Sequence, residues 1–179
     1  MRILGVDVGL SGAAAIFGHR GGPSNFPGLL SCIDLPTTGE GPARRIDCRA
    51  LAAWLAEWRP EHAYIENATA MPAIPDQFGN RRGMGAGTMA RYMRAVGQTE
   101  ACVDLSGADI KLVMPAVWKR RFGLVGPDKG NSLDVARDFF PAEAATILKR
   151  QKDHNRAEAC LIAVYGAERI GIINLSATE

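Results

Sequence analysis

The first strand-like segment of the chain carries an acid in its apolar interior. The run RILGVDVG (residues 2–9) is apolar apart from Arg2 and Asp7, as expected of a buried β-strand. Burying a carboxylate is unfavourable unless it is paired, hydrogen bonded or bound to a metal ion. Gly5 and Gly9 lie two residues to either side of Asp7 and leave room for a ligand or another backbone. Asp7 is therefore a candidate binding residue. The alternative is that its side chain hydrogen bonds to the backbone of the adjacent turn.

Further apolar runs predict the rest of a sheet. After a turn at residues 10–12, the run GAAAIFG is expected to pair with the first strand as a hairpin. The third run ends at Pro36, and the fifth enters a helical turn at Pro115. The runs that predict strands after the first are 12–18, 29–36, 62–67 and 109–118.

Apolar residues recur at helical spacing after the third run. They lie at i, i+3, i+4 and i+7 and predict an amphipathic helix that stops before Pro60: Leu51, Trp54, Leu55 and Trp58. Further helices are expected over residues 85–103, 129–141 and about 154–168. The connection over residues 68–87 is too long and too rich in Pro and Gly for a tight turn, so we expect a functional or mobile loop there.

The order of these elements predicts the fold class. Three strands are followed by a helix, a strand, a helix, a strand and two helices. This order predicts an α/β protein with a mixed five-stranded sheet, an antiparallel meander and then parallel strands, flanked by helices. Few folds begin this way, and they include the ribonuclease H-like fold and its larger relatives, the actin-like and sugar-kinase ATPases. We expect residues 1–179 to form a single ribonuclease H-like domain.

Two further regions supply candidate partners for the first acid. Glu66 ends the fourth strand, at the sheet edge where ligands bind in open α/β folds. In the terminal helix, His154 and Glu158 lie about 40° apart, so both can project toward the sheet if the apolar continuation packs on it. Asp153 lies about 140° from Glu158 around the helix. It can share the face of His154 and Glu158 only if it stands before the first helical turn. Its alternative role is the helix N-cap, and His154 has the alternative of a partly exposed first-turn residue.

Taken together, these segments resemble the RuvC-type Holliday junction resolvases of the ribonuclease H-like superfamily over nearly the whole chain. ILGVDVGLSGAAAI resembles the first hairpin of that family, AYIENA the fourth strand, and KDHNRAEACLIAVYG the final acidic helix. MPAVWKRRFGLVGPDKGNSLDVARDFFP is similar to the family's Pro-x-x-x-Lys segment with a second Lys some ten residues on. The bacterial pattern of two Asp spaced by three is absent, because Asn155 precedes Glu158 at that distance. The chain is closer to the phage and plastid branch, with its Lys-Asp-x-x-Arg-Ala-Glu pattern.

The resemblance implies a homodimeric endonuclease that resolves four-way DNA junctions by metal-dependent phosphodiester hydrolysis. Two Mg²⁺ or Mn²⁺ ions per active site would be held by Asp7, Glu66, His154 and Glu158. Asp153 is the second choice for the fourth position. The helix over residues 85–97 would form the dimer contact, unless it packs on the sheet instead.

The same resemblance implies DNA-binding residues in the middle of the chain. Lys119 and Lys129 would contact the scissile phosphate or its neighbours, and Arg120 is counted with them. Arg81 and Arg82, in the long loop, would enter the junction together with the nearby Phe78. Phe78 has the alternative of a simple turn anchor.

Charge and cysteine content agree with such a protein but do not specify it. The formal charge of +2 is small, but between residues 77 and 127 eight basic residues stand against three acids. This excess makes a polyanion a candidate partner, with a solvated helix face as the alternative. The four cysteines have no Cys-x-x-Cys spacing, and no run is long enough for a membrane span or has the pattern of a secretory signal. We therefore expect a cytoplasmic protein without structural zinc or membrane contact.

Alternative functions stay open at this point. GVDVGLSGAA also resembles a phosphate loop of actin-like or sugar-kinase-type ATPases, but nothing later in the chain repeats the pattern DxGxxxxA. We therefore expect no nucleotide cofactor. A ribonuclease H-like nuclease with another nucleic-acid substrate and a junction-binding protein without catalysis are the other possibilities.

Overall fold

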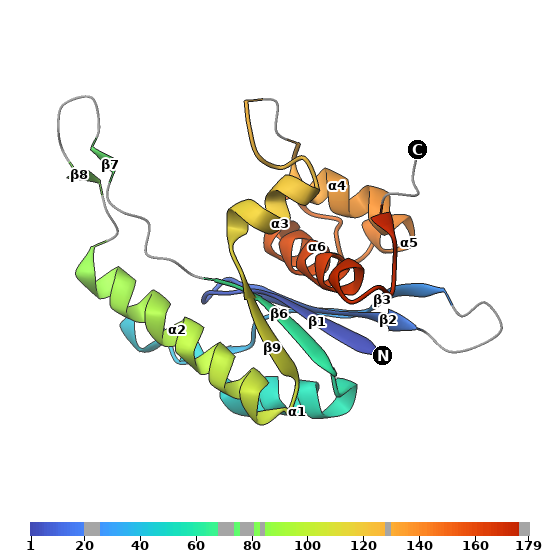
Figure 1. The fold of residues 1–179 in the computed structure, drawn as a ribbon. Coiled ribbons are helices and arrows are strands. Elements are labelled where there is room, and N and C mark those ends of the chain that lie inside the picture. Colours follow the sequence, from blue (N-terminus) through green and yellow to red (C-terminus); the bar gives the residue numbers. More distant parts are fainter. Residues whose placement is uncertain (20–25, 68–73, 76–80, 83–84, 128–129, 176–179) are drawn as a thin grey trace.

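The computed structural model describes residues 1–19, 26–67, 74–75, 81–82, 85–127 and 130–175. A five-stranded sheet lies between two helical layers (Figure 1). Helices α3 to α6 cover one face, and α1 and α2 cover the other. Each face has its own cluster of buried apolar side chains, so the sheet is covered on both sides.

The sheet has the strand order β3-β2-β1-β6-β9. The three strands at the start of the chain form an antiparallel meander, and β6 and β9 add to β1 in parallel. The predicted mixed sheet is thereby confirmed. Its strands are β1 (Arg2–Asp7), β2 (Ala13–His19), β3 (Pro27–Asp34), β6 (His62–Glu66) and β9 (Asp109–Val113).

Four short strands were not predicted. Each of these strands is two residues long, and together they form two antiparallel pairs outside the main sheet. The second pair lies within the predicted loop at residues 68–87, most of which falls outside the described residues. The pairs are β4 (Thr37–Thr38) with β5 (Arg45–Ile46), and β7 (Ile74–Pro75) with β8 (Arg81–Arg82).

The observed helices lie where the apolar periodicity of the sequence predicts them, but they begin and end at different residues. Asp47 caps α1 by accepting hydrogen bonds from the backbone N–H of Arg49 and Ala50, and Asn131 caps α4 through Leu133. The region predicted as one helix at residues 129–141 contains α4 and continues into α5. The helices are α1 (Cys48–Trp58), α2 (Ala86–Leu105), α3 (Pro115–Arg121), α4 (Ser132–Phe139), α5 (Pro141–Ala144) and α6 (His154–Arg169), with 3₁₀ turns η1 (Gly41–Ala43) and η2 (Gln151–Asp153). In the described part of the chain, every helix is too short or too polar to cross a bilayer.

Helix α6 approaches the sheet closely because β1 carries a glycine beneath it. A Cβ atom at Gly5 would collide with the backbone of Ala159 and Ala163. The segment from Ala159 to Val164 is buried completely or almost completely. This close packing fixes the start of α6 relative to the ends of β1 and β6, and therefore fixes the geometry of the acids.

Candidate metal centre

Three acids from distant parts of the sequence converge at one edge of the sheet. Asp7 is the last residue of β1 and Glu66 the last of β6, and these two strands are parallel neighbours. Glu158 lies in the second turn of α6, which packs against both strands. One carboxylate oxygen from each of the three side chains lies within 4.8 Å of the others. The predicted convergence of these acids is thus present in the structure.

The acids repel one another and are partly withdrawn from water. Burial raises the pKa of Asp7 well above its ordinary value, and the negative charges of Glu158 and Glu66 raise it further. Burial also raises the pKa of Glu66, against the lowering effects of a hydrogen bond from Trp118 and of the charge of Lys119. Such a group of hard oxygen donors suits a divalent cation such as Mg²⁺ or Mn²⁺, which would offset the repulsion.

Helix α3 supplies two consecutive residues to this centre. The indole N–H of Trp118 donates to Glu66 Oε2 over 2.8 Å, and Lys119 Nζ lies 2.9 Å from Glu158 Oε2. The Lys119 ammonium also lies 5.1 Å from the centre of the Trp118 ring. Pro115 at the start of α3 turns the chain into a helix directly after β9, which places both side chains over the edge of the sheet.

Sequence reasoning did not identify several residues of the centre. Trp118 is fully buried, and we expected it only in the turn after the fifth strand. Ser132 donates from its hydroxyl to Glu158 Oε1 over 3.3 Å. Tyr92 of α2 is near enough for the charges of Glu66 and Asp7 to raise its pKa, after the larger effect of burial. Only the position of Trp118 next to Lys119 offered a signal, because serine and tyrosine at such positions are common in helices.

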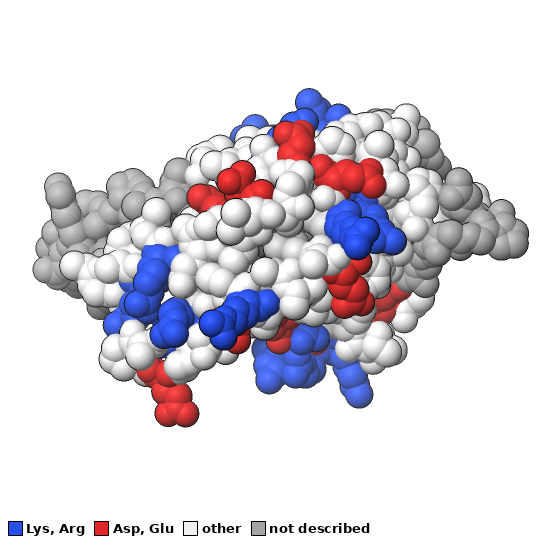
Figure 2. Space-filling model, turned by 90° about the horizontal axis from the view of Figure 1, so that it is seen from below, with Lys and Arg blue, Asp and Glu red and all other residues white. Residues whose placement is uncertain are grey.

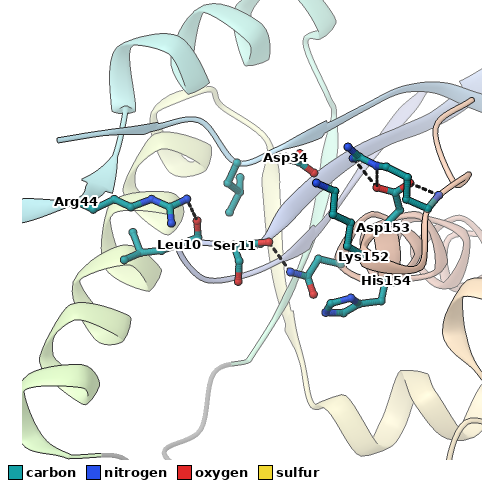
Figure 3. A pocket seen from close by; sticks show the side chains of 11 residues that line it. Leu10, Ser11, Asp34, Arg44, Lys152, Asp153 and His154 are labelled. Atoms are coloured by element: carbon teal, nitrogen blue, oxygen red, sulfur yellow. Dashed lines mark hydrogen bonds and ion pairs between the residues drawn. The ribbon is translucent and has the colours of Figure 1, made fainter. Parts of the chain in front are cut away.

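His154 and Asp153 are not in the group of three acids. His154 is the first residue of α6 and is exposed, and it lines a neighbouring cavity together with Ser11 and Asn155 (Figure 3). Asp153 is only 2 % exposed and accepts hydrogen bonds from the backbone and guanidinium of Arg150 at 2.6–2.9 Å. These bonds lower the pKa of Asp153, and they occupy its carboxylate oxygens with contacts inside the protein. The assignment of His154 as a fourth ligand stays a prediction.

The predicted DNA-binding residues fall into different surroundings. Lys119 lies within the acid centre, and Arg120 is exposed on the same helix. Arg81 and Arg82 form the short strand β8, which pairs with β7. Lys129 and Phe78 lie outside the described residues.

Part of the positive charge of the middle segment is neutralised by acids. Arg121 makes hydrogen bonds of 2.6–3.0 Å to Glu168, and Lys111 lies 3.7 Å from Asp109. Figure 2 shows the molecule from below, the side of α1 and α2, with groups of Lys and Arg, acidic groups and uncharged surface side by side. That face therefore has no uniform positive charge.

The strand order and the helices on both faces define a ribonuclease H-like α/β fold, of the kind found in RuvC-type resolvases. No protein-family model and no curated protein sequence matches the chain.

Solved structures of Holliday junction resolvases do match over most of their length. RuvC of Thermus thermophilus in complex with a Holliday junction substrate aligns with a TM-score of 0.61 and 15% identity, over 94% of this chain and 96% of RuvC. The Fowlpox virus resolvase in complex with Holliday junction DNA gives 0.53 and 15%, over 96% of this chain and 99% of the resolvase. The yeast mitochondrial resolvase Ydc2 gives 0.56 and 12%, over 90% of this chain and 75% of Ydc2.

Proposed function

We propose that this protein is a metal-dependent endonuclease that resolves four-way DNA junctions. The observation that carries the proposal is the convergence of Asp7, Glu66 and Glu158 at one sheet edge, within 4.8 Å of one another. This centre lies on a fold shared with solved resolvases, two of which are described in complex with junction DNA. A carboxylate group of this kind at the edge of an α/β sheet is suited to phosphodiester hydrolysis.

The three acids would hold Mg²⁺ or Mn²⁺, in one or two sites, with His154 as a candidate fourth ligand. Such ions activate water and stabilise the charge that develops on a phosphate during hydrolysis. Trp118 would keep the Glu66 carboxylate in position through its 2.8 Å hydrogen bond, because the buried indole has little freedom to move. The same bond favours the ionised form of Glu66, which is the form that binds a cation.

Lys119 would contact the phosphate that enters the centre. Its ammonium is 2.9 Å from Glu158 and half-buried against the Trp118 ring, so it is already held at the acids. A lysine at this position provides a point charge for a phosphate oxygen. Lys129 and Arg120 would extend this contact along the DNA backbone, and Arg81 and Arg82 would contact the branch point.

Symmetric cleavage of a junction requires two active sites, and we propose that the protein acts as a homodimer. Several apolar side chains of α2, of β9 and of the start of α3 are exposed, and they would supply the apolar part of the dimer contact. They are Met93, Leu105, Leu112, Met114 and Val117, each at least 42 % exposed. The opposite side of α2, with Ala95, Val96 and Val103, packs on the sheet, so the helix can serve both purposes. A DNA substrate and four free cysteines agree with a cytoplasmic location.

The test is cleavage of a synthetic four-way DNA junction by the purified protein with Mg²⁺ and with EDTA. We expect paired nicks at symmetric positions only with Mg²⁺, and none with Asp7→Asn, which should still bind the junction. Linear duplex and RNA–DNA hybrid serve as parallel substrates. Equal cleavage of either would favour a nuclease with another nucleic-acid substrate. Hydrolysis of ATP without any nuclease activity would favour the ATPase alternative.

A further inference from the structure

A polar cavity of about 400 Å³ is lined by Ser11, four residues after Asp7, and by His154, four residues before Glu158 (Figure 3). Its walls come from the turn after β1, from the end of β3 and from the segment that leads into α6. Arg44 and Lys152 reach it from opposite sides of Leu10 and Ser11. The side-chain amide of Asn155 donates to the carbonyl oxygen of Ser11 and so ties the start of α6 to the turn.

The two acids that line this cavity are already neutralised. Asp34 accepts two hydrogen bonds of 2.6 and 2.7 Å from Arg156, and Asp153 accepts a similar pair from Arg150. These charge-assisted bonds are the short and strong kind. Both acids are therefore paired with arginines and add no unpaired negative charge to the cavity.

Two of the lining cations have no acidic partner among the described residues. The Arg44 guanidinium donates to Thr37 Oγ1 over 3.2 Å and to the Leu10 carbonyl over 3.0 Å, and both acceptors are neutral. These bonds orient the guanidinium without cancelling its charge. Lys152 is exposed and has no hydrogen bond or ion pair in this part of the structure. Arg44 and Lys152 therefore give the wall of this cavity positive charge that an anionic ligand can balance.

The segments that carry two of the acids continue into the wall of this cavity. Ser11 follows Asp7 by one short turn, and His154 precedes Glu158 by four residues, about 6 Å along α6. Each strand of duplex DNA carries one phosphate per about 3.4 Å of its axis. A strand with one phosphate at the acids would therefore bring a nearby phosphate of the same backbone to the side of the cavity formed by Ser11 and His154.

We propose that this cavity binds a backbone phosphate next to the scissile one, with Arg44 and Lys152 as its ligands. The inference rests on the proposed nuclease function and adds a positioning site to it. The planar guanidinium of Arg44, held by two neutral acceptors, offers its remaining N–H donors to phosphate oxygens, and Lys152 adds a mobile point charge. The contact carries no sequence information and sets the register of the strand on the enzyme.

The test compares junction binding by Arg44→Gln, Lys152→Gln and the double variant with that of the wild type. Glutamine keeps hydrogen-bonding ability at each position but removes the charge. Arg169→Gln is the matched control, because Arg169 is exposed at the other end of α6, about 22 Å along the helix axis from His154. Dissociation constants for a fluorescently labelled four-way junction are measured in Ca²⁺ between 50 and 200 mM salt, and thermal unfolding verifies that each variant is folded.

We expect each single variant to bind about three- to tenfold more weakly and to lower the salt slope by about one, because one phosphate contact is lost. Cleavage by saturating enzyme should change less than affinity, and the control should match the wild type in both. Wild-type affinity and slope in the double variant would overturn the subsite while leaving the nuclease function intact. A wild-type protein that neither binds nor cuts DNA would overturn both proposals. Should Arg44→Gln fail to fold, Lys152→Gln and the charge reversal Lys152→Glu decide the outcome.

Discussion

The substitution Asp7→Asn should make the metal-free protein more stable while removing its ability to bind a divalent ion. Two like charges 4.8 Å apart repel by about 3.5 kcal/mol at an effective dielectric constant of about 20. Asp7 faces two such neighbours, Glu66 and Glu158, and is also partly desolvated. Lys119 and protonation of the group offset much of this energy. We therefore expect a gain of about 1–3 kcal/mol in the free energy of unfolding at neutral pH.

The gain should depend on pH in a defined direction. The folded protein raises the pKa of Asp7, so it holds this proton more tightly than the unfolded chain does. The stability of the metal-free wild type should fall as pH rises from the unfolded pKa of about 3.9 through the raised folded value. The variant lacks this group, so its advantage should vanish near and below pH 4 and grow as the pH rises.

Thermal unfolding followed by circular dichroism measures both effects. In EDTA at pH 7 the variant should melt roughly 2–12 °C above the wild type. Added Mg²⁺ should stabilise the wild type, by about 2.7 kcal/mol at one hundred times its dissociation constant, but leave the variant unchanged. Glu57→Gln, on the exposed side of α1, is the control for loss of one negative charge. A variant that melts below the wild type in EDTA, or that gains equally from Mg²⁺, would refute the reasoning.

Two further substitutions test the supports of the centre. Trp118→Phe removes the N–H donor to Glu66, so the pKa of Glu66 should rise, the Mg²⁺ requirement should increase, and the pH of half-maximal cleavage should move upward. A pH profile that keeps its midpoint while only the overall rate falls would contradict this role. Gly5→Ala places a methyl group against the backbone of α6, and denaturant unfolding should show a loss of at least about 3 kcal/mol. Stability equal to the wild type would mean that α6 does not need this close approach.

The main sheet and the final helix could be predicted because their signals are local and strong. Asp7 interrupts an apolar strand, and the stripe after His154 is too apolar for a surface helix. Both features require burial against another layer, and the structure confirms it.

The supports of the centre could not be predicted because they depend on how distant segments meet. Trp118 and Lys119 reach Glu66 and Glu158 only because α3 begins directly after β9 and crosses the edge of the sheet. Both His154 and Glu158 lie in α6, but the helical angle expected between them did not specify where the first turn of α6 lies relative to the sheet. The ion pair of Arg121 with Glu168 could not be predicted either, because Glu168 lies outside the segment whose charges were counted.

The central claim is that the three acids form a single divalent-ion centre. Anomalous diffraction from crystals soaked in MnCl₂ tests it most directly, because manganese scatters anomalously and replaces Mg²⁺ at oxygen ligands. We expect one or two peaks within bonding distance of Asp7, Glu66 and Glu158, and the same map would show whether His154 contributes a ligand. Manganese bound elsewhere, with no peak among these three carboxylates, would contradict it.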